Sequence, residues 1–150
     1  MNIHFICRGN VLRSLIAETY LRSLQLPNIT VTSSGTNVNL ASKTEREYFA
    51  NTIAVLKRHG IEAYAKDTSH QLTQMRTDGQ DITICMNQRV IDEANALVAL
   101  PNATRNWNIV DIGEGHRTTP ENIRQYEEDI FQEIVALVDT LALQLSHIKP

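Results

Sequence analysis

The chain has 150 residues, of which 42% are hydrophobic and 21% are charged, and its formal net charge is −3. This length suits one domain whose core needs no disulfides, so we expect residues 1–150 to form a single domain. The small negative charge argues against a surface for nucleic acid and against an anionic membrane surface as a partner.

The cysteines and the N-terminal segment indicate where the protein works. Cys7 and Cys85 are the two cysteines, which is too few for a disulfide scaffold. Arg8 interrupts the first apolar stretch before it reaches the length of a signal peptide or a membrane span. We therefore expect a cytoplasmic protein, whose reducing surroundings keep a thiol usable.

The first third of the chain predicts two strands with a helix between them. Residues 1–6 are an apolar run that Gly9 and Asn10 break, and apolar residues then recur at helical spacing from Ile16 to Leu24. Residues 29–33 alternate and are rich in β-branched side chains, which is typical of a strand.

The middle of the chain continues this alternation. Thr44 and Glu47 have the spacing of a capping box and predict the start of a helix that Gly60 ends. A short helix is expected after Thr68. Residues 81–86 have the pattern of a buried parallel strand.

The last third predicts a helix, a strand and a long helix. Residues 90–100 favour a helix that stops before Pro101, and residues 106–110 favour the last strand. The segment Thr119-Pro120-Glu121 has the N-cap and N1 residues of a final helix, whose apolar stripe runs from Ile123 to Leu145.

These elements predict an α/β fold with a four-stranded parallel sheet and helices on both faces, of the flavodoxin or Rossmann-like kind. Ligands of such sheets bind at the carboxyl ends of the strands. The loops that share this edge contain Cys7 and Arg13, Ser33 to Thr36, and Asp111.

Cys7 and Arg13 stand six residues apart where the first strand runs into its helix. A loop of this length can turn its N–H groups toward one point, and the helix adds the positive end of its dipole. The thiol suits a nucleophile, and the guanidinium fork suits two phosphate oxygens. Gly9 and Asn10 are the residues best able to take a positive φ there. We interpret the segment as a phosphate-binding loop; the alternative is an ordinary buried cysteine and a solvated first-turn arginine.

The sequence resembles the low-molecular-weight protein tyrosine phosphatase family along nearly its full length. Residues 7–14 look like the family's Cys-x-Gly-Asn-x-Cys-Arg-Ser loop, and residues 33–36 look like its Ser-Ala-Gly-Thr segment. Residues 56–61 resemble its Lys-Arg-His-Gly-Ile stretch, and residues 107–111 fall where the family carries its late acidic loop.

The resemblance implies a metal-independent phosphatase with a cysteinyl-phosphate intermediate, acting on phosphotyrosine in a protein or on a small aryl phosphate. Cys7 would be the nucleophile, Arg13 the phosphate ligand and Asp111 the general acid and base. Asn10 and Ser33 would form a hydrogen-bonded pair that supports the loop. The other expected substrate-binding residues are those of the loop: Arg8, Gly9, Asn10, Val11, Leu12 and Ser14.

No cofactor or metal is expected, since the five histidines have no ligand spacing such as His-x-x-x-His. The expected oligomeric state is a monomer or a weak dimer.

Some of the expected site residues have simpler alternative interpretations. Ser14 and Ser33 are also ordinary helix-start and turn residues, and Asp111 begins a turn-like segment in which Glu114 is a possible substitute acid.

The sequence also departs from the family pattern. Leu12 replaces the second loop cysteine, which removes a thiol that could trap the oxidised nucleophile as a disulfide. Ile112 replaces the proline after the acidic residue, and Asn87 replaces an aspartate. A catalytically weak anion-binding regulatory module therefore stays open as an alternative function.

Two related activities also stay open. A phosphoarginine phosphatase is disfavoured by Val11, where such relatives carry threonine, and an arsenate reductase is disfavoured because Cys85 is the only further cysteine.

Overall fold

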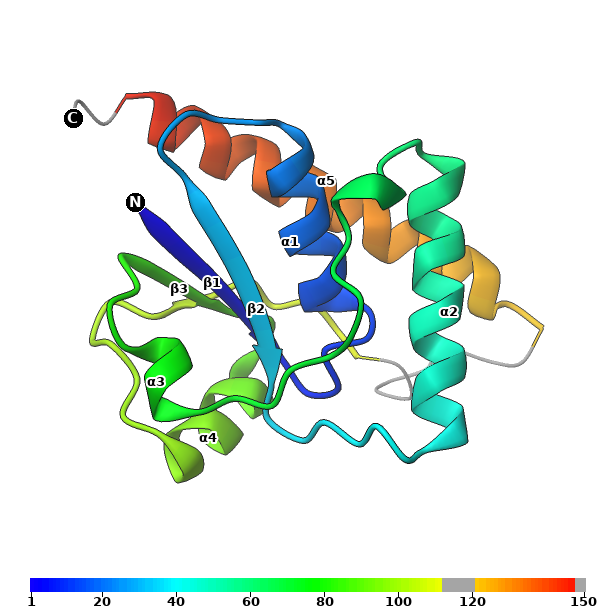
Figure 1. The fold of residues 1–150 in the computed structure, drawn as a ribbon, viewed down its shortest axis with the longest axis horizontal. Coiled ribbons are helices and arrows are strands. Elements are labelled where there is room, and N and C mark those ends of the chain that lie inside the picture. Colours follow the sequence, from blue (N-terminus) through cyan, green and yellow to red (C-terminus); the bar gives the residue numbers. More distant parts are fainter. Residues whose placement is uncertain (112–120, 148–150) are drawn as a thin grey trace.

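The structure is a computed structural model, and it describes residues 1–111 and 121–147. A four-stranded parallel sheet organises it (Figure 1). Its spatial order is β2-β1-β3-β4, and all three pairs of strands are parallel, as predicted. The strands are β1 (Asn2–Cys7), β2 (Thr30–Gly35), β3 (Ile82–Cys85) and β4 (Arg105–Asn106).

Helices cover both faces of this sheet, which confirms the predicted fold class. α1 (Arg13–Ser23), α2 (Lys43–Arg58) and α5 (Ile123–Ser146) lie on one side, whereas α3 (Gln74–Thr77) and α4 (Gln88–Leu97) lie on the other (Figure 1). The main core fills the α1 and α5 side. A smaller buried cluster on the opposite side consists of Ile6, Leu72, Cys85, Val90 and Ala94.

The predicted boundaries of α2 are right at one end only. The helix ends as expected, because Gly60 takes a φ of 73° that other residues rarely adopt. It begins earlier than the capping box at Thr44 suggested. Ser42 is the N-cap, and its hydroxyl accepts the backbone N–H of Glu45 at 3.2 Å.

The expected helix after Thr68 is wrong. The segment between α2 and β3 instead has a 3₁₀ turn at Glu62–Tyr64 and the short α3, whose N-cap is Thr73. Between them, Ser69 and His70 bind the loop that follows β1, so tertiary hydrogen bonds replace local helix formation there.

The last two elements are shorter than the sequence suggested. β4 covers two residues rather than 106–110, because Asn108 takes a φ of 54°, which is incompatible with a strand. α5 begins at Ile123 after Asn122. Thr119 and Pro120 of the expected cap lie outside the described residues.

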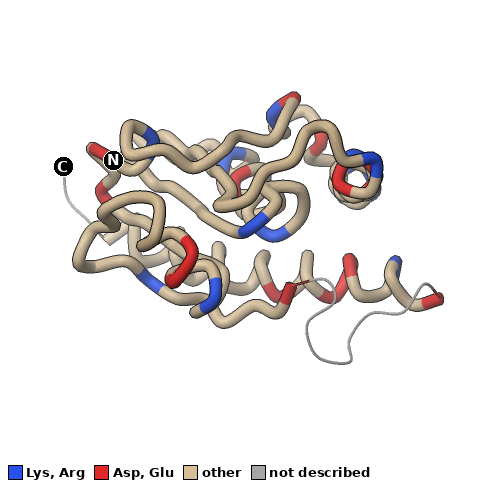
Figure 2. The backbone as a smooth tube through the Cα atoms, turned by 90° about the horizontal axis from the view of Figure 1, so that it is seen from below, with Lys and Arg blue, Asp and Glu red and all other residues tan. Residues whose placement is uncertain are grey.

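The strand order places the loop after β1 at the centre of the sheet edge. The chain goes from β1 to β2 on one side and later returns to β3 on the other side of β1. Such a reversal opens a crevice at the carboxyl end of the first strand. Acidic and basic residues are interspersed along the chain (Figure 2), as expected for a net charge of −3. Among the described residues, no helix is both long and apolar enough to span a membrane.

Candidate active site

The loop from Cys7 to Arg13 curls around the sulfur of Cys7. The backbone N–H of Asn10 points to Cys7 Sγ at 3.3 Å, and Ser14 Oγ lies 2.9 Å from the same sulfur. Asn10 takes the left-handed conformation predicted for it, with a φ of 55°, whereas Gly9 does not have a positive φ. One residue is therefore enough to make this turn.

Asn10 connects the loop to α1 and β2. Its side-chain amide donates to Ser14 Oγ at 2.7 Å and to Ser33 Oγ at 2.9 Å, and the residue is fully buried. The expected contact between Asn10 and Ser33 is thus present. A buried amide with both donors satisfied holds its neighbours in fixed positions.

The segment before α3 supplies three further contacts to Asn10, and sequence analysis missed all of them. Lys66 Nζ donates to Asn10 Oδ1 at 2.5 Å, the backbone N–H of His70 donates to the same oxygen at 2.9 Å, and Ser69 Oγ donates to the Asn10 carbonyl at 2.9 Å. Lys66 also reaches the Ser33 carbonyl at 2.9 Å. No sequence signal marks these residues, because their partners are more than 30 positions away.

The ammonium group of Lys66 is largely shielded from solvent. Burial, together with the positive charges of Arg76 and Arg22, lowers the pKa of Lys66 to about 8. The negative charges of Glu18 and Cys7 act in the opposite direction. A cation beside the loop of Cys7 strengthens the positive potential there.

Gly35, at the end of β2, is required by the close approach of this loop. A Cβ at this position would lie 2.4 Å from the Arg8 carbonyl oxygen and 3.0 Å from the Asn10 nitrogen. The neighbouring Thr36 and Asn37 donate their N–H groups to the Cys7 and Arg8 carbonyls at 3.0 and 2.9 Å. Backbone hydrogen bonds therefore join the loop after β2 to the loop after β1.

Arg13 closes the loop from the other end. Its side chain is 1% exposed, and Nη1 donates to the Ile109 carbonyl at 2.8 Å. Nη2 is buried and makes no hydrogen bond, although it lies 3.1 Å from Asp111 Oδ2. The structure thus brings Asp111 to the loop of Cys7 as an ion-pair partner of Arg13.

Arg8 is held from the opposite side of the sheet. Its Nε donates to both oxygens of Glu93 on α4, at 2.9 and 3.1 Å, and Thr36 Oγ1 donates to Glu93 Oε1 at 2.9 Å. Desolvation opposes the charge of Glu93, but the hydrogen bonds from Arg8 and Thr36 outweigh it and lower the pKa of this carboxyl. Arg8 is therefore an ion-paired loop residue, and its expected contact with substrate stays a prediction.

Val11 and Leu12 have side chains that belong to the core. They are 8% and 2% exposed, and the Val11 carbonyl accepts Thr52 Oγ1 at 2.6 Å. Both residues can offer a ligand their backbone N–H groups, and Val11 also lines a cavity beside the loop. Glu114 and Ile112, which the sequence places beside Asp111, lie outside the described residues.

A cavity of about 400 Å³ adjoins the loop. Apolar side chains from the loop, the segment after β2 and α2 contribute to its lining: Val11, Val38, Leu40 and Phe49. Glu45 and Asp67 also line it. Desolvation and the negative charge of Asp111 raise the pKa of Glu45, which places this carboxyl near the candidate acid. Within residues 1–111 and 121–147, no three His, Cys, Asp or Glu side chains are grouped to hold a metal ion.

Comparison with known proteins gives a consistent result. The model of the family "Low molecular weight phosphotyrosine protein phosphatase" matches residues 2–148. A putative low molecular weight protein-tyrosine-phosphatase of Klebsiella pneumoniae is 26% identical over 141 residues, which is 94% of this chain and 92% of that protein.

Solved structures share the fold. Wzb of Vibrio vulnificus, in complex with benzylphosphonate, superposes with a TM-score of 0.70 at 22% identity, over 95% of this chain and 97% of that chain. The arginine phosphatase YwlE, with a phosphorylated active-site serine, superposes with a TM-score of 0.64 at 18% identity, over 95% and 96% of the two chains.

Proposed function

The chain belongs to the low molecular weight phosphotyrosine protein phosphatase family, and we propose that it hydrolyses phosphate monoesters through a cysteinyl-phosphate intermediate. Cys7 is the nucleophile, Arg13 the phosphate ligand and Asp111 the general acid and base. The proposed substrate is phosphotyrosine in a protein. Both cysteines are unpaired, which suits the reducing cytoplasm that we infer as its location.

The strongest support is the guanidinium of Arg13. It is buried at the end of the loop that begins with Cys7, where Nη1 donates to the Ile109 carbonyl and Nη2 forms an ion pair with Asp111. A guanidinium has five N–H donors, and one hydrogen bond and one ion pair do not use all of them, so the remaining donors are expected to serve a ligand. A phosphate satisfies them, since two of its oxygens match the guanidinium fork.

The first step transfers the phosphoryl group to the enzyme. Cys7 Sγ, as thiolate, forms a bond to phosphorus while the bond from phosphorus to the substrate oxygen breaks. Arg13 and the loop amides hold the remaining oxygens. Asp111 gives its proton to the leaving oxygen; its carboxyl is within reach because Oδ2 lies 3.1 Å from Arg13 Nη2.

The second step returns the enzyme to its starting state. Asp111, now ionised, takes a proton from a water molecule whose oxygen attacks phosphorus, and the sulfur–phosphorus bond breaks with its electrons returning to Cys7. Ser14 Oγ, 2.9 Å from Sγ, is placed to donate a hydrogen bond to the thiolate that leaves. No metal is required by this scheme.

The cavity beside the loop supports an aromatic leaving group. Its lining includes Val11 and Phe49, which suit the flat apolar surface of a phenyl ring. The carboxyls of Glu45 and Asp67 in the same cavity favour a second candidate, phosphoarginine, because they could pair with a guanidinium.

Arsenate reductase activity has less support. Such chemistry needs a second reactive thiol, but burial and the neighbouring charge of Cys7 raise the pKa of Cys85 to about 12. A weak anion-binding module is the remaining alternative.

Two measurements test the proposal. Rapid acid quenching followed by mass spectrometry should find a phosphoryl group on Cys7, and more of it in Asp111→Asn, which is slow to hydrolyse the intermediate. Phosphate release from peptides should be faster with phosphotyrosine than with phosphoarginine or phosphoserine. Faster release from phosphoarginine would select the second candidate. Phosphate binding without release from any peptide would select the binding module.

A further inference from the structure

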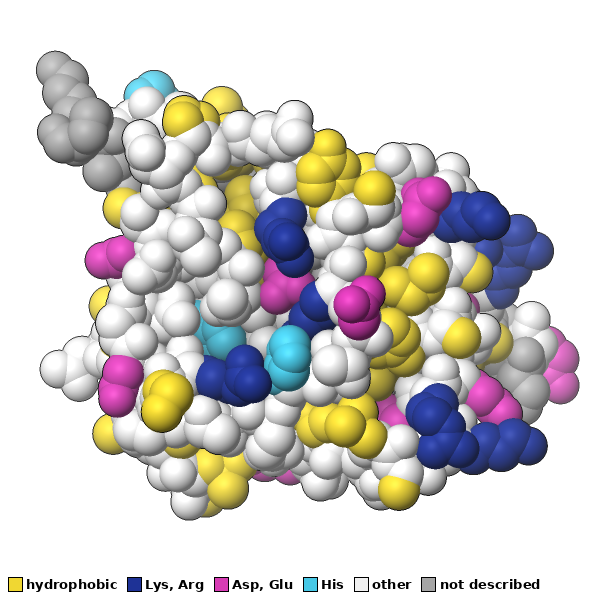
Figure 3. Space-filling model, viewed as in Figure 1, with side chains coloured by type: hydrophobic (Ala, Val, Ile, Leu, Met, Phe, Trp, Pro, Cys, Tyr) yellow, Lys and Arg dark blue, Asp and Glu magenta, His cyan; other side chains and the backbone are white. Residues whose placement is uncertain are grey.

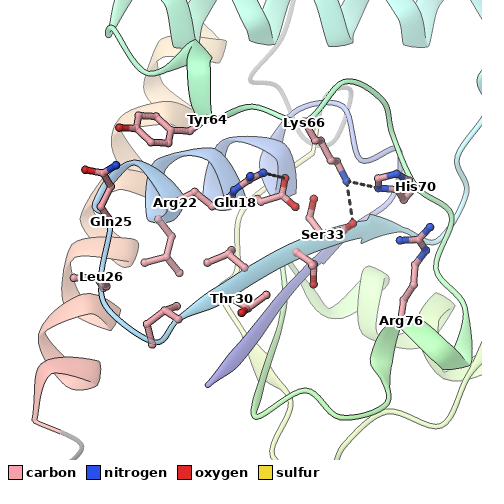
Figure 4. Close-up of a pocket in the computed structure, with 14 residues that line it drawn as sticks. Glu18, Arg22, Gln25, Leu26, Thr30, Ser33, Tyr64, Lys66, His70 and Arg76 are labelled. Carbon is pink, nitrogen blue, oxygen red and sulfur yellow. Dashed lines mark hydrogen bonds and ion pairs between the residues drawn. The ribbon is translucent and has the colours of Figure 1, made fainter.

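A second cavity, of about 610 Å³, lies along the outer edge of β2 (Figure 4). It is formed by β2, the C-terminal half of α1 and the segment from Tyr64 to Arg76. Its volume is within the range of small-molecule sites. The apolar part of its lining consists of Leu21, Leu26, Ile29, Val31 and Tyr64.

Basic side chains surround this cavity. Lys66, His70 and Arg76 lie near one end of β2, and Arg22 lies toward the other end (Figure 4). In the surface view, dark blue and cyan side chains lie around the middle of the face, with magenta side chains between them (Figure 3). The guanidinium of Arg76 donates no hydrogen bond to any described residue, and that of Arg22 lies 3.9 Å from Glu18, in an ion pair rather than a hydrogen bond.

Glu18 offsets these cations only in part. It is 3% exposed, lies 3.9 Å from Arg22, and its Oε2 accepts no hydrogen bond from the described residues. Burial raises the pKa of this carboxyl by more than the charges of Lys66 and Arg22 and the hydrogen bonds from Ser33 lower it. Burial also lowers the pKa of His70, and the charges of Lys66 and Arg76 lower it further. The basic groups thus repel one another, which an anion would relieve.

The hydrogen bonds of Lys66 and His70 define which groups can hold a ligand. Lys66 donates to Asn10, to Ser33 and, at 3.3 Å, to His70 Nδ1, so it offers charge rather than a free donor. Because His70 Nδ1 accepts this hydrogen bond, we assign the ring proton to Nε2. Arg76 and His70 therefore both have donors for an anion beside Lys66.

We propose that this cavity is a second binding site, for a small organic anion. Arg76 and His70 hold its charged group beside Lys66, and its apolar part packs on Val31, Leu21 and Tyr64. None of these residues belongs to the loop of Cys7, so the site is separate from the proposed catalytic site. Lys66, His70 and Ser33 line this cavity and also contact Asn10 of that loop.

The test uses 2-naphthoate, a carboxylate with a flat apolar body, titrated calorimetrically in saturating inorganic phosphate. The phosphate occupies the loop of Cys7, so binding reports the second cavity. We expect one saturable site, and acetate should bind at least about tenfold more weakly because it lacks the apolar part. Amide shifts in NMR should be largest around Val31 and Tyr64.

Matched arginine variants locate the charged group. Arg76→Gln should weaken 2-naphthoate binding at least about fivefold, since it removes a charge-assisted hydrogen bond. Arg124→Gln, at an exposed arginine of α5 outside the cavity, should leave the affinity unchanged. Both arginines are exposed, and unchanged melting temperatures would show that the variants fold.

Three results would overturn the proposal: no saturable binding, equal weakening in both variants, or amide shifts centred on residues 7–13. The outcome does not depend on the proposed catalytic function. Cys7→Ser should bind 2-naphthoate with the affinity of the native protein, whether or not the native protein hydrolyses phosphate esters.

Discussion

Asn10 uses every polar atom it has to hold the loop of Cys7 in shape. Its N–H points to Cys7 Sγ, its carbonyl accepts Ser69, and its side-chain oxygen accepts Lys66 and the His70 N–H. Its side-chain nitrogen donates to two hydroxyls. The positive φ adds a conformational demand that asparagine meets at low cost. The geometry at the sulfur thus depends on contacts from three separate segments.

Lys66 should be a positioning residue for this loop. Lys66→Met keeps the apolar stem but removes the ammonium group from Asn10 and Ser33, so we expect kcat/KM for an aryl phosphate to fall about tenfold. The pKa of Lys66 is about 8, and its charge is present below that pH and lost above it. The native kcat/KM should therefore decline above pH 8 by a component that Lys66→Met lacks.

A pH profile of kcat/KM makes this comparison. Lys43→Met is the control, because Lys43 is 85% exposed and pairs with Glu47 on α2, outside the loop of Cys7. If Lys66→Met kept both the native value and the native profile, the ammonium group would have no part in positioning the loop.

Oxidation should inactivate the protein without forming an internal disulfide. Leu12 offers no thiol to a sulfenic acid on Cys7, and Cys85 is fully buried with its pKa raised to about 12 by burial and by the charge of Cys7. After mild peroxide treatment, mass spectrometry should show oxygen added to Cys7. A Cys7–Cys85 disulfide would contradict this prediction.

At the scale of elements, α4 supports the loop from the face opposite α1. Glu93 projects from α4 to Arg8 and Thr36, and thus joins the loops after β1 and β2. The two charged side chains are 28% and 29% exposed, so the pair should add at most about 1 kcal/mol to stability. Its main effect is electrostatic, because it reduces the positive potential that Arg8 brings to the loop.

Removal of this acid should strengthen phosphate binding. In Glu93→Gln the amide oxygen still accepts hydrogen bonds from Arg8 and Thr36, but the negative charge is gone. We expect inorganic phosphate to inhibit about two- to threefold more strongly, with little change in melting temperature. Glu47→Gln, at a 60% exposed residue of α2, is the control. Weaker inhibition in Glu93→Gln would show that the ion pair serves to shape the loop instead.

The elements differ in how well the sequence predicts them. β1, α1, β2, β3 and the α2 terminator Gly60 follow local patterns of hydrophobicity and turn residues, so they were predictable. The segment from Ile61 to Thr73 was not, because its conformation is fixed by Asn10 and Gly35 rather than by its own spacing. β4 was overestimated, since its apolar residues continue past the turn at Asn108.

The residues of the candidate site also differ in how well the sequence predicts them. Cys7, Asn10, Ser14 and Ser33 lie in short motifs whose chemistry can be read locally, and the structure brings these four together. Lys66, Glu93 and Glu45 come from segments whose sequence has no special spacing. Only the folded arrangement places them beside the loop.

For the molecule as a whole, His4 should make stability depend on pH. It is fully buried in β1, bonded to Thr32 Oγ1 at 2.6 Å and Ser34 Oγ at 2.7 Å. Burial, and then the charges of Lys66 and Arg76, lower its pKa from 6.5 to about 3. Between these values the unfolded state binds more protons, so the stabilisation is complete above pH 6.5 and is lost as the pH falls toward 3.

Chemical denaturation at several pH values tests this dependence against His4→Gln, which cannot titrate. The free energy of unfolding of the native protein should fall relative to that of the variant by up to about 1.4 kcal/mol per pH unit below 6.5. Glu18 and Glu127 titrate in both proteins and cancel in the difference. A difference that stays constant from pH 7 to 4 would contradict the assignment of His4 as a buried neutral side chain.

The most direct test of the proposed function is the hydrolysis of p-nitrophenyl phosphate by the native protein, Cys7→Ser and Asp111→Asn, with a chelator present. Cys85→Ala is the matched control for the nucleophile, because Cys85 is the other cysteine. We predict turnover that survives the chelator, is abolished in Cys7→Ser, falls strongly in Asp111→Asn and is retained in Cys85→Ala. Turnover that persists in Cys7→Ser, or none in the native protein while phosphate still binds, would contradict the cysteine-dependent phosphatase.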